Sequence, residues 1–293
     1  MPFVTVGQEN SGAVDLYYED HGSGKPVVLI HGYPLSGRSW GQQTLALLRE
    51  GYRVVTYDRR GFGKSSQPTT GYDYDTFAED LHKLITKLDL RDVTLVGFSM
   101  GGGEVARYIG KHGTGRVSKA AIISGITPYL LKTAENPGPL DQAAVQGIQS
   151  AIEKDRLAFL TGWNQNFYNL DTLLGKRISE EVVRDSWNEA AGASPKATID
   201  CPASWLTDFR SDLAQFKLPT LVMHGDADRV LPISATGIRT HEAVKDSRLV
   251  VVAGAPHGML ATHADEVNQA LIGFLGGRNV GNKATSGRTS PEA

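Results

Sequence analysis

The feature that most constrains this fold is a series of short apolar runs, most of them continuous rather than alternating with polar residues. Along the chain the runs read VDLYY, PVVLIHG, RVVTYD, VTLVGF, KAAIISG, PTLVMHG and SRLVVVAG. Such runs are typical of strands that are buried on both faces of a sheet. Helical patterns lie between several of them, around residues 40–49, 74–88 and 102–111, so consecutive strands need crossovers and should run parallel. The sequence therefore predicts an α/β fold with a mostly parallel, doubly wound sheet.

This alternation of strands and helices breaks between Gly125 and Leu218, where tryptophan, tyrosine and phenylalanine stand among polar residues. We interpret residues 126–217 as a helical cap, inserted between late strands of a single domain that spans residues 1–275. The last helix of the domain is expected in THADEVNQALIGFL. Residues 276–293 are polar and rich in Gly and Ser, so we expect them to form a disordered tail.

Composition limits the partners that this protein can have. The chain carries 30 basic and 32 acidic side chains and a formal net charge of -2, which gives no broad basic surface for nucleic acid or an anionic membrane. No apolar run approaches the roughly 20 residues that a membrane-spanning helix needs. Cys201 is the only cysteine, and the first ten residues lack the pattern of a signal peptide. We therefore expect a soluble, cytoplasmic protein that acts on small molecules.

The segment VTLVGFSMGGGEVARYIG, residues 93–110, passes from a strand pattern through a cluster of glycines into a helix pattern. Its glycines match the spacing of a dinucleotide-binding turn, and Gly63, Lys64 and Ser65 suggest a phosphate-binding loop elsewhere. The next strand, however, ends without the acidic residue that a ribose would need, and no Tyr has a Lys four residues later. The phosphate-binding loop would require a glycine where Asp58 stands. Both nucleotide interpretations are therefore disfavoured.

The same segment contains the pattern G-x-S-x-G, with Ser99 at its centre. In this pattern small flanking residues allow a sharp turn from strand to helix, and the turn exposes the serine hydroxyl. Serine is a weak nucleophile unless a base takes its proton and nearby donors stabilise the developing oxyanion. The pattern therefore predicts that an oxyanion hole, an acid and a base lie elsewhere in the chain.

Candidates for these parts follow predicted strands. Gly32 in VVLIHGYPL permits a tight turn that directs the Tyr33 amide towards the serine, and Met100, at the start of the helix, supplies a second amide. Asp226 and Asp228 both follow the strand in LVMHGDADRVLPI. The position of Asp228, three residues after a strand-ending glycine and shortly before Val-x-Pro, favours Asp228 as the acid.

Of the eight histidines, His257 follows the last predicted strand, in VVVAGAPHG, and completes the chain order Ser, Asp, His. His263 is the alternative base, although its position at the start of the final helix favours a capping role. His224 ends a strand, where packing is the expected role. The predicted triad is therefore Ser99, Asp228 and His257.

These residues resemble the α/β-hydrolases, and longer stretches resemble one group of them, the cofactor-free bacterial haloperoxidases. This group is also called non-haem chloroperoxidases or perhydrolases, and it is close to esterases and γ-lactamases. The resemblance covers nearly everything from Pro2 to Leu275, including PVVLIHGYPLSG, VGFSMGGGEVARY, WLTDFRSDL and GAPHG. It implies an α/β-hydrolase fold and assigns the nucleophile, acid and base to the three triad residues, with the oxyanion amides at Tyr33 and Met100.

The resemblance also implies a reaction. An ester or carboxylic acid acylates the serine, and water or hydrogen peroxide then releases an acid or a peracid, which oxidises halide. No cofactor and no metal are implied, and relatives are commonly homo-oligomers, often trimers. A γ-lactamase acting on a lactam, or a plain carboxylesterase, is the alternative, and a non-catalytic binding protein of the same fold is a more remote one. Gly102 and Ala261 stand where relatives often have threonine and tryptophan, which suggests a wider acyl pocket.

Overall fold

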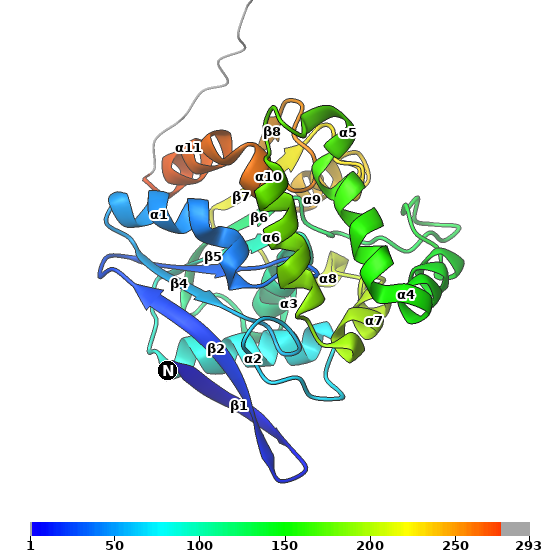
Figure 1. Cartoon of the computed structure of the whole chain (residues 1–293). Helices are drawn as coiled ribbons and strands as arrows, with labels where there is room; N and C mark the ends of the chain where they lie inside the picture. The colour runs from blue at the N-terminus through cyan, green and yellow to red at the C-terminus, as the bar shows by residue number, and fades with distance from the viewer. Residues whose placement is uncertain (1, 277–293) are drawn as a thin grey trace, which may run out of the picture.

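The structure is a computed structural model and describes residues 2–276. Within these residues one eight-stranded sheet has the order β1-β2-β4-β3-β5-β6-β7-β8 (Figure 1). The strands are β1 Phe3–Glu9, β2 Gly12–His21, β3 Pro26–Ile30, β4 Arg53–Tyr57, β5 Val93–Phe98, β6 Val117–Ile123, β7 Thr220–Gly225 and β8 Ser247–Val252. The pairs β1–β2 and β2–β4 are antiparallel, and all the others are parallel. The predicted mostly parallel α/β sheet is confirmed.

Helices cover both faces of this sheet (Figure 1). Those outside the insertion are the 3₁₀ helix η1 Gly37–Trp40, α1 Gly41–Arg49, α2 Tyr74–Lys87, α3 Met100–His112, α9 Gly237–Ala243, α10 Met259–Thr262 and α11 Ala264–Leu275. α1 and α11 pack together on one face, and α2 and α3 pack together on the other. The Asp73 side chain begins α2 by accepting a hydrogen bond from the Thr76 amide at 2.9 Å, which satisfies an amide that has no partner within the helix.

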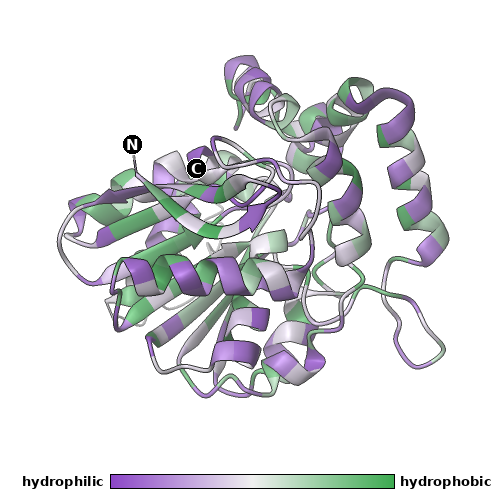
Figure 2. Cartoon of the chain, turned by 90° about the horizontal axis from the view of Figure 1, so that it is seen from below, coloured by the Kyte–Doolittle hydropathy of each residue, from purple (hydrophilic) through white to green (hydrophobic). Residues whose placement is uncertain are grey.

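The continuous apolar runs arise because successive residues of a central strand face different cores. In β3, Val27 and Leu29 pack with α1 and α11, whereas Val28 and Ile30 pack with α2 and α3. Figure 2 shows hydrophobic residues along the strands, with hydrophilic and hydrophobic residues mixed on the helices around them. A strand with both faces buried has no polar face, so its sequence does not alternate.

The insertion between β6 and β7 is helical, as the sequence predicted. Its helices are α4 Gln142–Tyr168, α5 Leu170–Leu173, α6 Glu180–Ala191, α7 Pro195–Ser204 and α8 Arg210–Leu213. α4 is kinked at Asp155, whose backbone leaves the helical conformation. The Asp155 side chain accepts a hydrogen bond from the Ala158 amide at 2.9 Å and so caps the second half of the helix.

The parallel strands end at one edge of the sheet, and the predicted site residues follow these ends. Tyr33 lies shortly after β3, Ser99 directly after β5, Asp228 after β7 and His257 after β8. In open α/β sheets this edge is where ligands bind.

Two further sequence predictions concern the C-terminal tail and membrane-spanning helices. The predicted tail, residues 276–293, lies outside the described residues except for Gly276. Among residues 2–276, no helix combines the length and the apolar character needed to cross a membrane.

Candidate active site

Ser99 lies in a strained turn between β5 and α3. Its φ of 54° and ψ of -117° are unusual for a residue with a side chain. The turn is possible because Gly97 and Gly101, two residues before and after Ser99, have no Cβ. A Cβ on Gly97 would lie 2.2 Å from the Gly101 carbonyl oxygen, and a Cβ on Gly101 would lie 2.3 Å from the Ile30 carbonyl oxygen. The glycines of the G-x-S-x-G pattern are therefore required by close packing of the backbone.

The structure brings the three predicted triad side chains together. His257 Nε2 lies 2.9 Å from Ser99 Oγ, and His257 Nδ1 lies 2.8 Å from Asp228 Oδ2. All three residues are buried, and His257 is 0% exposed. The Phe98 and Phe167 rings lie against the imidazole, each with its centroid 5.1 Å from that of His257. The imidazole is thus held between the serine hydroxyl and the carboxylate.

The Asp228 carboxylate is buried but remains ionised. Its Oδ1 accepts hydrogen bonds from the amides of Val230, at 2.9 Å, and Leu231, at 2.8 Å. Burial acts to raise the pKa of Asp228, but the charge of His257 and hydrogen bonds from His224 and His257 lower that pKa well below its ordinary value. An ionised carboxylate at this position can orient an imidazole and stabilise its protonated form.

The two alternatives named from sequence lie in different environments. Asp226 is exposed, and its Oδ1 accepts a hydrogen bond from the Gly254 amide at 2.6 Å, so it stabilises a turn. His263 is the N-cap residue of α11, but its side chain makes no capping hydrogen bond. Its Nδ1 instead lies 2.9 Å from Thr262 Oγ1.

The turn after β3 holds the Tyr33 backbone beside Ser99. The Gly32 carbonyl accepts hydrogen bonds from His31 Nδ1, at 2.8 Å, and from the Leu35 amide, at 3.1 Å. Because the Gly32–Tyr33 peptide is trans, its N–H points opposite to this carbonyl and away from both donors. A Cβ on Gly32 would lie 2.9 Å from the Ser99 Cβ, so only glycine allows this approach.

His31 is a residue whose role the sequence analysis missed. It is 0% exposed, and its Nε2 accepts a hydrogen bond from the Arg59 amide at 2.9 Å. Burial and the Arg59 charge both hold the pKa of His31 well below its ordinary value. The ring is therefore neutral, with its proton on Nδ1, and this proton fixes the Gly32 carbonyl.

Met100, the second predicted oxyanion donor, is the first residue of α3. Amides in the first turn of a helix have no carbonyl partner within that helix, and the helix dipole favours negative charge there. The side chain of Ser99, at the N-cap position, makes no capping hydrogen bond. The amide end of α3 is thus directed at the site beside the serine.

Ser99 lines a small, mainly apolar cavity of about 80 Å³ between the sheet and the cap. Its other lining residues are Tyr33, Met100, Ile126, Leu130, Leu140, Ile148, Trp163, Trp205, Val230 and Leu231. The Tyr33 ring meets those of Trp205 and Trp163 edge to face, with centroids 5.0 and 5.7 Å away. The Tyr33 hydroxyl donates a hydrogen bond to the Thr198 carbonyl of α7 at 2.9 Å, which connects the cap to the turn after β3.

The suggestion that Gly102 and Ala261 widen the acyl pocket is wrong, because neither lines this cavity. Gly102 faces β6 and the loop after it: a Cβ there would lie 3.0 Å from Ile122 Cγ2 and 3.1 Å from the Gly125 Cα. Ala261 lines a different cavity, together with Phe98, Phe167 and Gly258. Position along the sequence near Ser99 or His257 did not indicate which way each residue faces.

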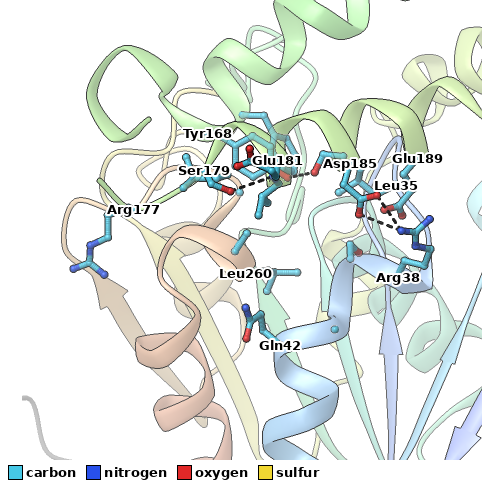
Figure 3. A pocket seen from close by; sticks show the side chains of 18 of the residues that line it. Leu35, Arg38, Gln42, Tyr168, Arg177, Ser179, Glu181, Asp185, Glu189 and Leu260 are labelled. Carbon is cyan, nitrogen blue, oxygen red and sulfur yellow. Dashed lines mark hydrogen bonds and ion pairs between the residues drawn. The ribbon is translucent and has the colours of Figure 1, made fainter. Parts of the chain in front are cut away.

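That second cavity, of about 490 Å³, lies between α6 and the core (Figure 3). Phe98 and Phe167, the rings that hold His257, form part of its wall, but Ser99 does not. Arg38 and Asp185 form an ion pair at its rim, with Nη2–Oδ distances of 3.0 and 3.2 Å. Within residues 2–276, no three His, Cys, Asp or Glu side chains form a group that could hold a metal ion.

Comparison with known proteins supports the geometry. A family model described as alpha/beta hydrolase fold matches residues 25–264. The chain is 58% identical to a provisionally named non-heme chloroperoxidase from Synechocystis sp., over 94% of this chain and 100% of that protein. It is 36% identical to a bifunctional esterase/perhydrolase from Acinetobacter calcoaceticus, over 94% of this chain and 99% of that protein. The crystal structure of a bromoperoxidase from Bacillus anthracis matches with a TM-score of 0.90 and 51% sequence identity, and the match covers 94% of this chain and 99% of that one.

Proposed function

The chain belongs to the alpha/beta hydrolase fold family, and from this premise we propose that it is a serine-dependent acyl-transfer enzyme. It hydrolyses small esters, forms peracids from carboxylic acids and hydrogen peroxide, and oxidises halide through those peracids. The observation that carries the proposal is the continuous line of hydrogen bonds from Ser99 Oγ through His257 to Asp228, at the wall of a small apolar cavity. Relatives named as chloroperoxidase, bromoperoxidase and esterase/perhydrolase support this reaction class.

In the first half of the reaction, Ser99 Oγ attacks the carbonyl carbon of an ester or carboxylic acid. His257 Nε2 takes the hydroxyl proton as the bond forms, and Asp228 stabilises the resulting imidazolium through Nδ1. The tetrahedral intermediate collapses when the alcohol, or water from a carboxylic acid, leaves with the proton from His257. The product of this half is an ester between the acyl group and Ser99.

In the second half, water or hydrogen peroxide attacks the acyl carbonyl and gives its proton to His257. Collapse then breaks the bond to Ser99 Oγ, which recovers a proton from His257. Water yields the carboxylic acid, and hydrogen peroxide yields the peracid. The peracid transfers its terminal oxygen to a halide ion, which is oxidised to hypohalite, while the peracid is reduced to the carboxylic acid.

The oxyanion of each intermediate accepts hydrogen bonds from the Tyr33 and Met100 amides in this proposal. Support comes from the Gly32 carbonyl, which His31 and Leu35 hold on the opposite side of the peptide, and from the position of the Met100 amide as the first of α3. Donors fixed before the reaction require no reorganisation when charge develops. The small apolar cavity beside Ser99 favours short acyl groups, and we propose that residues 126–217 act as the cap that encloses them.

Labelling with a fluorophosphonate tests whether the site is catalytic. The wild-type protein should gain one covalent adduct by intact mass, and Ser99→Ala should gain none. An unlabelled wild-type protein would favour the alternative of a non-catalytic binding protein, and a labelled Ser99→Ala variant would place the nucleophile elsewhere.

A kinetic panel separates the catalytic alternatives. p-Nitrophenyl esters of increasing acyl length, a γ-lactam, and acetate with hydrogen peroxide are compared on one preparation. We expect ester hydrolysis and peracid formation to exceed lactam opening, and the reverse order would favour a γ-lactamase. From the resemblance we also predict a homo-oligomer, such as a trimer, and sedimentation would test its size. A cytoplasmic location likewise stays a prediction.

A further inference from the structure

His224 lies at the end of β7, directly behind the acid of the triad. The residue is 0% exposed, and its Nε2 is 2.8 Å from the Leu231 carbonyl oxygen. The same Nε2 is 3.2 Å from Asp228 Oδ2, the oxygen that faces His257. The sequence indicated only a packing role for this histidine, because nothing in the strand pattern shows that the following loop folds back over it.

The surroundings of His224 show which of its ring nitrogens donates a hydrogen bond. The Leu231 carbonyl can only accept a hydrogen bond, so Nε2 carries the proton. Nδ1 is buried and has no hydrogen-bond partner among the described residues. Gly237 closes that side of the ring, since a Cβ there would lie 2.8 Å from Nδ1. A second proton on Nδ1 would be a buried, unpaired donor, so Nε2 is the nitrogen that donates.

With His224 included, each oxygen of Asp228 faces two donors. Oδ1 accepts from the amides of Val230 and Leu231, and Oδ2 faces His257 Nδ1 and His224 Nε2. A carboxylate offers about four lone-pair sites, so the set of donors is complete. Donors on both oxygens fix the rotation of the carboxylate about its Cβ–Cγ bond.

We propose that His224 is a positioning residue for the acyl-transfer reaction: its single Nε2–H, 2.8 Å from the Leu231 carbonyl oxygen and 3.2 Å from Asp228 Oδ2, is shared between them and holds Oδ2 in line with His257 Nδ1. The inference rests on the proposed function, and it assigns to His224 no contact with substrate. Without this donor, Oδ2 has only His257 as a partner, and the carboxylate can rotate about the bonds to Oδ1. The imidazole then loses its fixed orientation towards Ser99.

A purely structural role is the competing explanation, because His224 also binds the Leu231 carbonyl and so ties the loop after β7 to the strand. If the role is only structural, substitution of His224 should lower the free energy of unfolding and leave the turnover of the folded enzyme unchanged. Three substitutions separate the two roles. The amide of His224→Gln can donate from nearly the position of the imidazole Nε2, the shorter amide of His224→Asn cannot reach Asp228, and His224→Phe keeps the ring without a donor.

The experiment measures kcat and KM for p-nitrophenyl acetate, and urea unfolding, for each variant. We expect kcat to fall about 10-fold to 100-fold in His224→Asn and His224→Phe with KM within about twofold of wild type, and to be restored in His224→Gln. His241→Phe, which removes a histidine of α9 whose Nδ1 contacts Ser247 Oγ at 2.7 Å, is the control and should keep the wild-type kcat. If His224→Phe does not fold, the comparison of Gln with Asn decides.

A double-mutant cycle with Asp228→Asn provides the second readout. If His224 acts through Asp228, then His224→Asn should lower kcat no further in the Asp228→Asn background. Equal kcat in the Gln and Asn variants, or full additivity in the cycle, overturns the positioning role. Ser99→Ala is measured alongside, because activity retained in that variant would overturn the proposed function instead.

Discussion

Asp226 and Asp228 lie two residues apart but occupy opposite environments. Asp228 is buried, and its oxygens face two backbone amides and two imidazoles. Asp226 is exposed and accepts a hydrogen bond from the Gly254 amide. One carboxylate therefore contacts the His257 imidazole, while the other stabilises a turn between the ends of β7 and β8.

We expect Asp228→Asn to lower kcat for p-nitrophenyl acetate by about ten-thousandfold, because an amide at this position favours the wrong tautomer of His257. Asp226→Asn is the matched control, and its kcat should stay within about threefold of wild type, since surface substitutions of this kind have small effects. The reverse ranking of the two variants would transfer the role of the acid to Asp226.

His31 gives a second test with single residues. Replacement by leucine removes the Nδ1–H that holds the Gly32 carbonyl, and the Tyr33 amide loses its fixed direction. We expect kcat to fall about 100-fold with little change in KM, as for loss of one oxyanion donor. Steady-state kinetics with a short-chain ester measures both constants. An unchanged kcat in a folded His31→Leu variant would show that the Leu35 amide alone fixes the turn.

At the scale of elements, a largely buried carboxylate is one of the contacts that join the cap to the core. Glu189 of α6 accepts hydrogen bonds from the amide and the hydroxyl of Ser36, just before η1. Burial raises the pKa of Glu189 to about 7, while the bonds from Ser36 act to lower it. Between pH 4.5 and about 7 the folded protein therefore holds a proton that the unfolded chain has released. The free energy of unfolding must fall as pH rises through this range.

Glu189→Gln should remove this dependence, because glutamine keeps the acceptor oxygen and does not titrate. We expect wild type to lose roughly 1–3 kcal/mol of unfolding free energy relative to Glu189→Gln between about pH 5 and pH 8. Urea denaturation of both proteins at the two pH values measures the difference. Parallel changes in the two proteins would contradict the assignment of a titrating carboxylate to this contact.

The sequence predicted seven strands correctly because each contains a short apolar run, and most of these runs are continuous. β1 was missed: it lies at the open edge of the sheet, and its inward residues Val4 and Val6 alternate with exposed ones. The contact of Ser99, His257 and Asp228 was predictable because these residues follow strand ends in a fixed order, and their catalytic roles stay predictions. The contacts of His224 and His31 were not predictable, because they depend on how loops fold back over the strands. The directions of Gly102 and Ala261 depend on tertiary packing in the same way.

For the whole molecule, one arrangement supports several reactions. The parallel strands bring Ser99, Asp228, His257 and the turn after β3 to one edge, and the helical insertion borders a small cavity beside Ser99. Nothing in this arrangement selects the second nucleophile, since water and hydrogen peroxide are both small and both give their proton to His257. Hydrolysis and peracid formation should therefore share a single acyl-enzyme on Ser99.

The most direct test of this account is peroxide-dependent bromination of a phenol-red-type acceptor, measured on the same samples as ester hydrolysis. We predict that bromination requires a small carboxylate such as acetate, is unaffected by a chelator, and is lost together with ester hydrolysis in Ser99→Ala, where turnover should fall by several orders of magnitude. Bromination that persists in carboxylate-free buffer, or in Ser99→Ala, would contradict a shared acyl-enzyme and leave ester hydrolysis as a separate activity.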